Sequence, residues 1–461
     1  MAIWPFNVFR RDNPAPAAPI RRSFDAATGG RRASGFKSYG PHNPETLAAA
    51  APIRSRARHA YANGAYVKNG IDAQVAEIIG SGVRGNSAHP DADLRPLIDS
   101  RFAECAAEID ADGRTDFYGL QSAMVLAMIV DGESFALIEE SPDGIKLRQL
   151  PAEMVDESLT RDLGAGGYCV AGVEFSASGG RVAYHILSGR PTDLFPTYQS
   201  PTRVPAADVI HLMRPIGPGQ VRGVSWLAPV LLTLNEYDQL SDALLVGAKV
   251  SAMLAGFVTD GSAMGGSAFP DAQGDIADLS LEPGTIRILP AGTDIKFSAP
   301  DQAKDGIPFA KLILGQIASG LGVPTHLLDN DLTGANYSSL RAGLLPFRAK
   351  VEQLQYHTLI PQFLDPVFRR VIAHEYLAGR LDLPAIGPAL KAEWLTPSPM
   401  QVDPLKDIAA LEKSLALGLT SRRQAVASLG WSVDDLDSEI NADREREAAL
   451  GLSFSGGKKD D

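Results

Sequence analysis

Residues 336–343, with the sequence NYSSLRAG, mark a point where a loop ends and a long helix begins. Upstream, residues 317–324 (IASGLGVP) form an apolar, helix-like run that is closed by glycine and proline. Downstream come Trp394, the proline-rich turn at 397–399, and the segment VDPLKD at 402–407. Because glycine and proline interrupt helices, these landmarks predict a helix, a polar loop, a long helix and a further helical region, in that order.

Five further segments serve as landmarks. In order along the chain they are RSRAR at 54–58, IIGSGV at 78–83, DGESF at 131–135, LEPG at 281–284 and GLTSRR at 418–423. Each is a turn, a cap or a packing element, and none is catalytic in character. Together with the landmarks above, this order resembles the lambda-type family of tailed-phage portal proteins. The resemblance covers roughly residues 50 to 455.

The resemblance implies an α+β portal fold, assembled as a ring from subunits with a mixed α/β wing, long stem helices, a strand-containing clip and a helical C-terminal region. The implied division of the chain is a basic, proline-containing arm at 1–55, the wing at 56–222, a stem helix at 223–256, the clip at 257–306, a second stem helix at 307–324, a tunnel loop at 325–337, long kinked helices that return to the wing at 338–400, and a helical, crown-like region with a polar tail at 401–461.

The resemblance also implies a mechanical function without enzyme activity or cofactors. A ring of about twelve copies would form the DNA channel at one capsid vertex of the virion. The implied partners are further copies of the chain, double-stranded DNA in the channel, the terminase large subunit, head-completion or tail adaptor proteins, and the major capsid protein with its scaffold. Synthesis is expected in the host cytoplasm, with no membrane association.

Periodicity and turn residues predict the secondary structure from the residues themselves. Helices are expected at 60–79, 116–130, 225–250, 309–321, 338–359, 361–378, 404–417 and 421–450, the last range holding one or two helices. Strands are expected at 135–138, 167–173, 182–187, 209–212, 286–289 and 295–297. Gly80 is expected to end the first helix, Thr115 to cap the second, and Pro361 to begin a new helix while kinking the one before it.

Charge is spread unevenly along the 461 residues, whose formal net charge is −12. Residues 1–60 hold ten Lys or Arg against three Asp or Glu, which leaves 33 against 52 in the rest and gives charges of +7 and −19. An acidic body disfavours tight binding to phosphates and suits a channel wall that repels sliding DNA. Acidic residues that only solvate the surface explain the balance equally well.

The chain has two cysteines, Cys105 and Cys169, without metal-ligand spacing between them. This usage predicts a reducing compartment and buried free thiols rather than a disulfide framework. The N-terminal residues lack the charge-then-apolar order of a secretory signal, and the apolar run at 123–130 stops at Asp131. Because a membrane-spanning helix needs about 20 apolar residues, no such helix is expected.

Two sets of functional positions follow from the resemblance. The first belongs to the tunnel loop and the adjoining helix, where acidic side chains would repel phosphates: Asp329, Asn330, Asp331, Gly334, Asn336, Tyr337 and Arg341. The second belongs to the clip: Leu281, Pro283, Gly284 and Arg287. Arg341 opposes the positive end of the helix dipole, which predicts a tertiary partner. That partner is either a carboxylate of a neighbouring subunit, which we favour, or a DNA phosphate.

Two short motifs, at 80–85 and 329–334, support the alternative of a soluble cytoplasmic enzyme with a nucleotide or metal site, and a third partly matches a catalytic motif. Residues 80–85 (GSGVRG) match a dinucleotide-binding spacing, but a helix rather than a strand is expected before them. Residues 329–334 (DNDLTG) imitate half of a calcium loop, whose twelfth position is Leu340 instead of glutamate. Residues 223–227 begin like a nucleophile elbow without its closing glycine, so Ser225 is interpreted as a helix cap.

Overall fold

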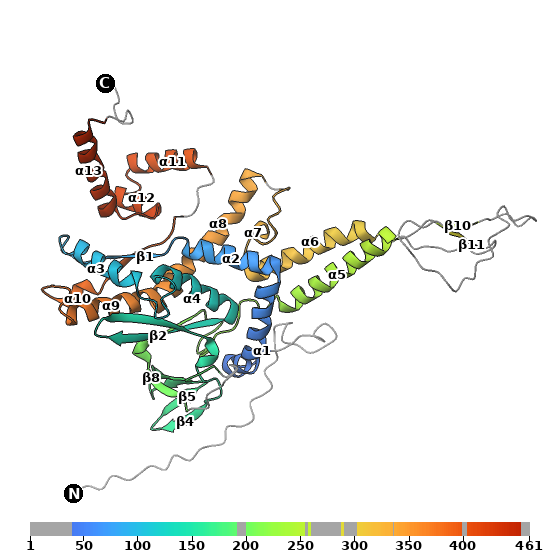
Figure 1. Ribbon diagram of the computed structural model, residues 1–461, viewed down its shortest axis with the longest axis horizontal. Coiled ribbons are helices and arrows are strands. Elements are labelled where there is room, and N and C mark those ends of the chain that lie inside the picture. Colours follow the sequence, from blue (N-terminus) through green and yellow to red (C-terminus); the bar gives the residue numbers. More distant parts are fainter. Residues whose placement is uncertain are drawn as a thin grey trace, which may run out of the picture.

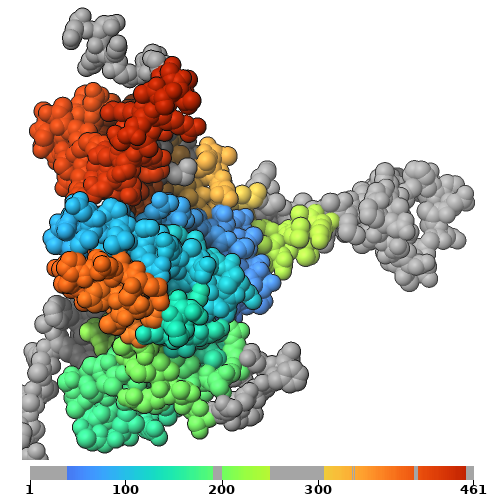
Figure 2. All heavy atoms as spheres, turned by 60° about the vertical axis from the view of Figure 1, so that its left-hand side comes forward, coloured from blue at the N-terminus to red at the C-terminus, as the bar shows by residue number. Residues whose placement is uncertain are grey.

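The computed structural model describes residues 39–190, 200–253, 257–259, 287–289, 302–334, 336–398 and 403–452. A body of helices and antiparallel sheets carries a long helical hairpin that projects from one side (Figure 1). A separate group of C-terminal helices lies on the body, on the side opposite the larger sheet (Figure 2). The chain is therefore of mixed α and β structure, as the sequence predicts.

Two helices open the described part of the chain. α1 (His42–Asn63) begins inside the range expected to be an arm, and the sequence analysis missed it because its alanine-rich sequence contains Pro52 and has no clear apolar stripe. α2 (Ala65–Ile79) follows after Gly64, so the helix expected at 60–79 is interrupted there. Its predicted end is confirmed, since Gly80 has a φ of 51°, a conformation that glycine adopts readily.

Two further helices follow, of which α3 packs against β1, α4 and α9, and α4 packs against β2 and β9. α3 (Arg95–Ala107) was not predicted, whereas α4 (Phe117–Asp131) agrees with the expected helix at 116–130. The cap is Asp116 rather than Thr115, because the Asp116 side chain accepts a hydrogen bond from Gly119 N at 2.8 Å. α4 is apolar around most of its circumference and is buried between its neighbours.

Eight strands form the two sheets below these helices. In the three-stranded sheet, β2 (Glu133–Ser141) lies between β3 (Gly144–Leu150) and β9 (Val209–Met213). The five-stranded sheet follows chain order: β4 (Arg161–Gly164), β5 (Gly167–Val170), β6 (Val173–Phe175), β7 (Arg181–Ile186) and β8 (Thr202–Pro205). All neighbouring pairs in both sheets are antiparallel.

The expected strands at 135–138, 182–187 and 209–212 are confirmed, and the one expected at 167–173 is two strands, β5 and β6, separated by a turn. Between the sheets lies a small apolar core, in which the fully buried Phe135 of β2 packs against Tyr184 of β7. The same ring stacks on His211 of β9, with ring centroids 4.2 Å apart. This core joins the two sheets into one unit.

A continuous helical rod crosses the body. It consists of α8 (Tyr337–Leu354), a π-helical segment (Gln355–Leu364) and α9 (Asp365–Leu377). The prediction that Pro361 begins a new helix is therefore wrong: the wider π-helical turns accommodate this proline inside the segment. The rod and its neighbours share the main core, whose fully buried members include Phe363 and Phe368.

Two glutamines of the rod form hydrogen bonds with main-chain groups at the ends of other elements. Gln355 Nε2 donates to Ile78 O at the end of α2, at 2.6 Å. Gln362 Oε1 accepts from Met213 N at the end of β9, at 2.9 Å. The rod is thereby attached to both a helix and a sheet of the body, in addition to its apolar packing.

The remaining elements surround this body. β1 (Arg84–Ser87) pairs with β12 (Ala392–Leu395), and the short helix α10 (Ile386–Ala389) precedes β12. The C-terminal helices are α11 (Pro404–Ala416), α12 (Arg422–Ser428) and α13 (Val433–Leu450), which agree with the helices expected at 404–417 and 421–450.

Candidate functional site: the hairpin, its root and the adjoining loop

The projecting hairpin consists of α5 (Leu231–Met253) and α6 (Gln302–Leu321), which pack along each other (Figure 1). α5 begins six residues after the predicted cap Ser225, whose Oγ instead accepts from Leu227 N at 3.2 Å within a turn. At about 1.5 Å per residue, the 23 residues of α5 span roughly 35 Å. Large apolar side chains on both helices are exposed: Leu232, Leu245 and Val246 on α5, and Ile307, Phe309 and Leu312 on α6.

The root of the hairpin is residues 216–223, and side-chain hydrogen bonds hold its main chain. Gln220 accepts from Ile216 N at 2.7 Å and donates to Arg222 O at 2.9 Å. Asn43 of α1 donates to Gly219 O and accepts from Val221 N, both at 2.9 Å. The conformation of the root is thus determined both locally and by the first helix.

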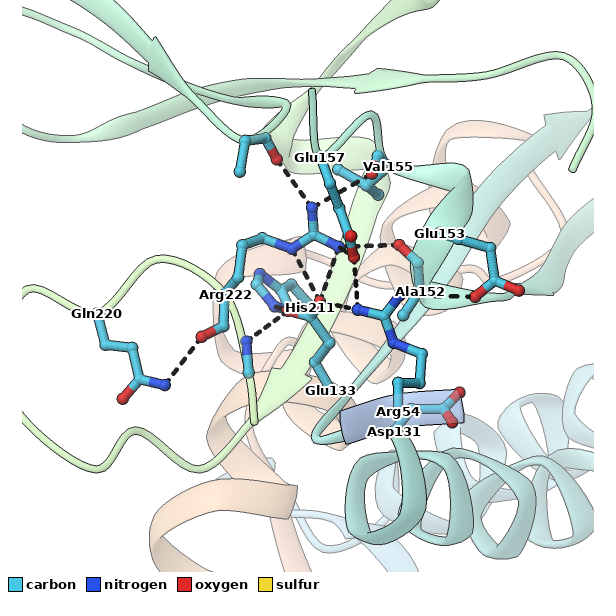
Figure 3. A network of polar contacts seen from close by, with 12 residues as sticks. Arg54, Asp131, Glu133, Ala152, Glu153, Val155, Glu157, His211, Gln220 and Arg222 are labelled. Carbon is cyan, nitrogen blue, oxygen red and sulfur yellow. Dashed lines mark hydrogen bonds and ion pairs between the residues drawn. The ribbon is translucent and has the colours of Figure 1, made fainter. Parts of the chain in front are cut away.

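Glu133, fully buried at the start of β2, is the centre of a polar network beneath the root (Figure 3). Its carboxylate accepts from Arg222 Nε at 2.8 Å, from Gly223 N at 2.7 Å and from His211 Nε2 at 3.1 Å. The other guanidinium nitrogens of Arg222 donate to the main-chain oxygens of Ala152, Val155 and Ala171. Because every partner lies in the body, the network attaches the root to the two sheets.

Two arginines of α1, Arg54 and Arg58, extend this network, and Arg54 is labelled in Figure 3. Arg54 forms an ion pair with Glu157. Arg58 forms ion pairs with Asp131 at the end of α4, at 2.7 Å, and with Glu153, at 2.8 Å. The first helix, the end of α4 and the turn between β3 and β4 are therefore tied to one another by charge.

Burial and neighbouring charges shift the pKa values of Glu133 and His211, and the two effects act in opposite directions. Burial alone would raise the pKa of Glu133, but Arg222 and His211 outweigh it and hold the pKa well below its ordinary value. Burial lowers the pKa of His211 to about 4, so this imidazole is neutral at pH 7 and donates to the carboxylate. The network therefore contains an ionised carboxylate–guanidinium pair with a neutral histidine.

Two glycines allow the root to approach the body closely. Gly132, with a φ of 97°, ends α4, and a Cβ built on it would lie 2.2 Å from Val224 C. A Cβ built on Gly223 would lie 2.2 Å from Gly132 O. Since no side chain fits at either position, the two backbones cross in direct contact, which brings Gly223 N to Glu133.

The predicted tunnel loop begins with the short helix α7 (Thr325–Asp329) and continues through Asn330, whose φ is 56°. Asp331 forms an ion pair with Lys311 of α6 at 2.7 Å, and Lys311 holds the pKa of this carboxyl well below its ordinary value. Asp331 was expected to repel phosphates, but its charge is offset within the subunit. Asp329 accepts from Asp331 N at 3.0 Å, and Gly334 is exposed.

The end of the loop is a helix cap. Asn336 Oδ1 accepts from Ser339 N, and Ser339 Oγ accepts from Asn336 N, both at 2.9 Å. Arg341 forms an ion pair with Asp407 of α11 at 3.2 Å. Sequence reasoning expected a partner on a neighbouring subunit or on DNA, and within the subunit Asp407 already pairs with this guanidinium.

Most of the predicted clip lies outside the described residues, including Leu281, Pro283 and Gly284, the side chain of Arg287, and the strand expected at 295–297. What is described is a pair of short strands, β10 (Phe257–Thr259) and β11 (Arg287–Leu289). They are parallel, so they are not the two arms of one β-hairpin. β11 agrees with the strand expected at 286–289.

The motifs that support an enzyme have a different context in the structure. Residues 80–85 lead from α2 into β1, so no helix opens there to hold a pyrophosphate. Across the residues that the structure describes, no group of three or more His, Cys, Asp or Glu side chains is placed to hold a metal ion. No helix in the described ranges is both long enough and apolar enough to cross a bilayer.

Sequence reasoning missed the network around Glu133. The DGE sequence at 131–133 was recognised only as a family landmark and as the end of an apolar run. A glutamate directly after a long apolar helix is a signal of a buried charge. Its partners Arg222 and His211 lie 89 and 78 residues away, so only the tertiary structure identifies them.

The chain is similar in sequence to proteins of tailed phages. The family model described as phage portal protein, lambda family, matches residues 28–355. A probable portal protein of Halomonas phage phiHAP-1 is 26% identical over 432 residues, covering 88% of this chain and 82% of the relative. Portal protein B of Escherichia phage lambda is 22% identical over 475 residues, covering 90% of this chain and 89% of the relative.

Among solved structures, a similar chain comes from the neck of a native gene transfer agent particle, computed with C12 symmetry. It is 15% identical, with a TM-score of 0.43, and the likeness covers 87% of this chain and 97% of that chain.

Proposed function

The chain belongs to the lambda family of phage portal proteins, and from that premise we propose that about twelve copies of it form a ring around a DNA channel at one capsid vertex. The ring would admit DNA during packaging, retain it, release it at ejection and connect the head to tail components. This work is mechanical, because the protein provides a shaped channel and the energy comes from a separate motor.

The projecting hairpin is the observation that supports the ring. Six large apolar side chains of α5 and α6 are exposed in the isolated subunit, although the hairpin extends far from the body. Exposed apolar patches on such an element indicate an interaction surface. In a closed ring each hairpin has a neighbour on either side, so both faces can be covered by heterologous contacts.

The size of the purified protein tests the ring directly. Light scattering and electron microscopy are expected to give closed rings of roughly a dozen subunits, by family resemblance. A stable monomer that binds a nucleotide or a metal ion would instead support the alternative of a cytoplasmic enzyme.

The clip at 257–306 is proposed to dock the terminase large subunit, while other faces of the ring contact adaptor, capsid and scaffold proteins. Exposed loops tolerate deletion. Removal of residues 262–275, which are small, polar and glycine-rich, is therefore expected to preserve rings and to impair terminase docking and packaging. Normal packaging by this deletion would exclude the segment from the docking surface.

The loop at 325–337 is proposed to line the narrowest part of the channel. It follows α6, a stem helix, and ends at the cap of α8. Because Asp331 is paired with Lys311, the sharper test uses Leu332, which is 54% exposed in the same loop. Leu332→Lys adds about twelve positive charges to a ring and is expected to slow packaging most strongly at low salt.

Leu332→Gln is the matched control, since it removes the same apolar group without adding charge. It is expected to package at the rate of the unmodified protein. Equal packaging rates for Leu332→Lys and Leu332→Gln at low salt, in rings verified by microscopy, would mean that the loop does not face DNA.

A further inference from the structure

A groove with an apolar lining lies on the body beside the C-terminal helices. Its volume is about 900 Å³, and it is enclosed by α2, α8 with the π-helical segment, the stretch at 393–398 and α12. The apolar side chains that line it include Leu327, Leu344, Val351, Tyr356 and Trp394. A groove of this size has room for several large apolar side chains of a partner.

Two aromatic side chains determine what the groove can hold. Trp394 is buried, and its Nε1 donates to Asp365 Oδ1 at 2.6 Å, so the indole ring is fixed in the wall. Tyr356 is 46% exposed. Aromatic rings pack favourably against other aromatic rings, and their faces attract cations. The groove therefore suits a segment that carries both aromatic and basic side chains.

The charge of the groove is negative. Glu77 and Arg348 in its lining form an ion pair at 3.2 Å, so their charges offset each other. Glu352 and Glu393 are exposed in the same lining, and neither forms an ion pair with any residue that the structure describes. Two carboxylates are thus left to attract the basic side chains of a partner.

Two other cavities lack this combination. The cavity of about 640 Å³ next to the root carries Arg214 and Lys350, so it would repel a basic segment. The cavity of about 490 Å³ between α3 and α13 contains carboxylates, but Arg95 and Arg423 both form ion pairs with Asp434 there. The groove is therefore the better acceptor for a basic, aromatic segment.

The N-terminal segment, residues 3–11 (IWPFNVFRR), has the complementary pattern. Five large apolar side chains are followed directly by two arginines: Ile3, Trp4, Phe6, Val8, Phe9, Arg10 and Arg11. Residues 1–38, which precede the described part of the chain, hold seven Lys or Arg against two Asp or Glu. Both the aromatic content and the charge of this segment match the groove.

The chain is long enough to bring the segment to the groove. The described part begins beside the root, because Asn43 of α1 forms hydrogen bonds with Gly219 and Val221. Val351 of α8 lines both the groove and the cavity next to the root, so one helix separates these two sites. Residues 12–38 form a linker of 27 residues. A linker of this length extends up to about 90 Å, so it reaches the groove of the same subunit.

We propose that residues 3–11 dock in this groove of their own subunit. The aromatic side chains of the segment pack against Tyr356 and Trp394. Its two arginines face Glu352 and Glu393. Because one chain carries both the segment and the groove, the linker keeps the effective concentration of the segment high, and weak contacts suffice for docking. The contact goes beyond the proposed ring and does not depend on it.

Acrylamide quenching of Trp4 fluorescence tests the contact in the full chain. The Trp4 signal is the difference between each protein and its Trp4→Phe form. In the unmodified protein Trp4 is expected to be shielded from acrylamide. Glu352→Lys combined with Glu393→Lys reverses the charge of the groove, so it is expected to raise the quenching constant of Trp4 at least about threefold.

The matched control combines Asp382→Lys with Glu439→Lys. Both residues are exposed and lie outside the groove lining, and the change in net charge is the same. The quenching constant of Trp4 is expected to stay at the unmodified value. Equal quenching constants in the groove variant and the control would overturn the proposal, as would a Trp4 that is fully accessible in the unmodified protein.

A charge swap separates docking from a general loss of structure. Arg10→Glu with Arg11→Glu is expected to expose Trp4, because the segment then carries the same charge as the groove. Adding Glu352→Lys and Glu393→Lys to this variant should restore the shielding. Failure of the four substitutions together to restore it would overturn the assigned orientation of the segment and with it the proposal.

Dilution identifies which copy supplies the segment. Shielding of Trp4 is expected to be independent of protein concentration, because the segment and the groove belong to one chain. Shielding that is lost when assemblies dissociate would mean that a neighbouring copy supplies the segment, and would overturn docking within the subunit.

Trypsin provides an independent measure with an internal control. The chain before α1 contains three arginine pairs, at 10–11, 21–22 and 31–32, of which only the first lies in the docked segment. Glu352→Gln combined with Glu393→Gln is expected to raise the initial cleavage rate at 10–11 at least about threefold and to leave the rate at 31–32 unchanged. An unchanged rate at 10–11, measured by mass spectrometry, would contradict docking in the groove.

Discussion

The root of the hairpin, residues 216–223, and the C-terminal helices at residues 403–452, called the module below, differ in where they place charged and apolar side chains. Charged groups are buried at the root, and apolar side chains are exposed in the module. At the root, Glu133 and Arg222 are buried and every neighbour is supplied by the same chain. In the module, leucines such as Leu405 are exposed and the ion pairs, such as Arg422–Asp437, lie on the surface. The root therefore has its charges paired within the subunit, whereas the module leaves apolar side chains exposed.

The largest expected effect is at the root. Arg222→Ala leaves the Glu133 carboxylate buried without its guanidinium partner, which typically costs about 3–5 kcal/mol in the free energy of unfolding. Arg422→Ala, which breaks an exposed ion pair of the module, is the control and should not change the melting temperature measurably. Urea unfolding of both variants measures the difference. Equal effects would remove the contrast between the two regions.

The glycine crossing below the root comes next. Gly132→Ala meets the main chain at Val224 and is expected to destabilise the protein by at least about 2 kcal/mol. Gly418 is the control, because it also has a positive φ, 69°, but has open space around it. A substitution there tests backbone strain without a close contact. Gly418→Ala suffers only the backbone strain, about 1 kcal/mol. If the two substitutions proved equally costly in urea unfolding, close contact at the root would not be the cause.

Acidification provides a third test of the root. The folded-state pKa of His211 is lowered to about 4 from 6.5, and that of Glu133 is also lowered, so the unfolded chain binds more protons than the folded one. Stability from these groups is complete above pH 6.5 and is lost as the pH falls toward 4, by as much as a few kcal/mol.

His211→Gln keeps a hydrogen-bond donor without the titration. The variant is expected to lose less stability between pH 7 and pH 5 than the unmodified protein, as measured by the urea midpoint. An identical loss would show that His211 does not titrate on unfolding.

The smallest predicted effect is at the contact between the module and the body. Burial, together with Asp435 and Asp434 of α13, raises the pKa of Asp99 on α3 to about 6, against the opposing effects of the hydrogen bond from Ser87 N and of Arg95. The ionised form is disfavoured, so stability from this site is present at low pH and is lost as the pH rises through about 6. After solvent screening, the loss is no more than about 1–2 kcal/mol.

Asp99→Asn keeps the acceptor for Ser87 N and removes the charge. Protection of α13 against proteolysis at pH 8 is expected to increase in this variant, while below about pH 4, where Asp99 is protonated in the folded protein and largely protonated in the unfolded chain, it should match the unmodified protein. A variant that is cleaved equally fast at pH 8 would contradict the opposite pH behaviour of the two regions.

How far the sequence could predict this structure depended on whether a feature was local. The end of α2 at Gly80 follows from residues within one turn, and it is confirmed. α3 was missed because Arg95–Ala107 shows little amphipathic pattern, although Ile98 and Phe102 are buried. Local patterns do not show which side of a helix another segment will cover.

The polar sites were harder to predict because their partners are distant in sequence. Arg341 was correctly expected to have a tertiary partner, but Asp407 lies 66 residues away. Asp331 was identified as an acidic residue of the loop, while Lys311, which pairs with it, lies on the preceding helix. The sequence identifies a charged residue, but only the fold shows which oppositely charged residue forms an ion pair with it.

The crossing of Gly132 and Gly223 has a consequence for how sequences of this kind can diverge. Each residue lies against the main chain of the other segment, so neither position can accept a side chain while the other stays in place. A change at either one requires the backbones to separate, which would remove the hydrogen bond from Gly223 N to Glu133. Mutational drift should therefore be nearly arrested at both positions.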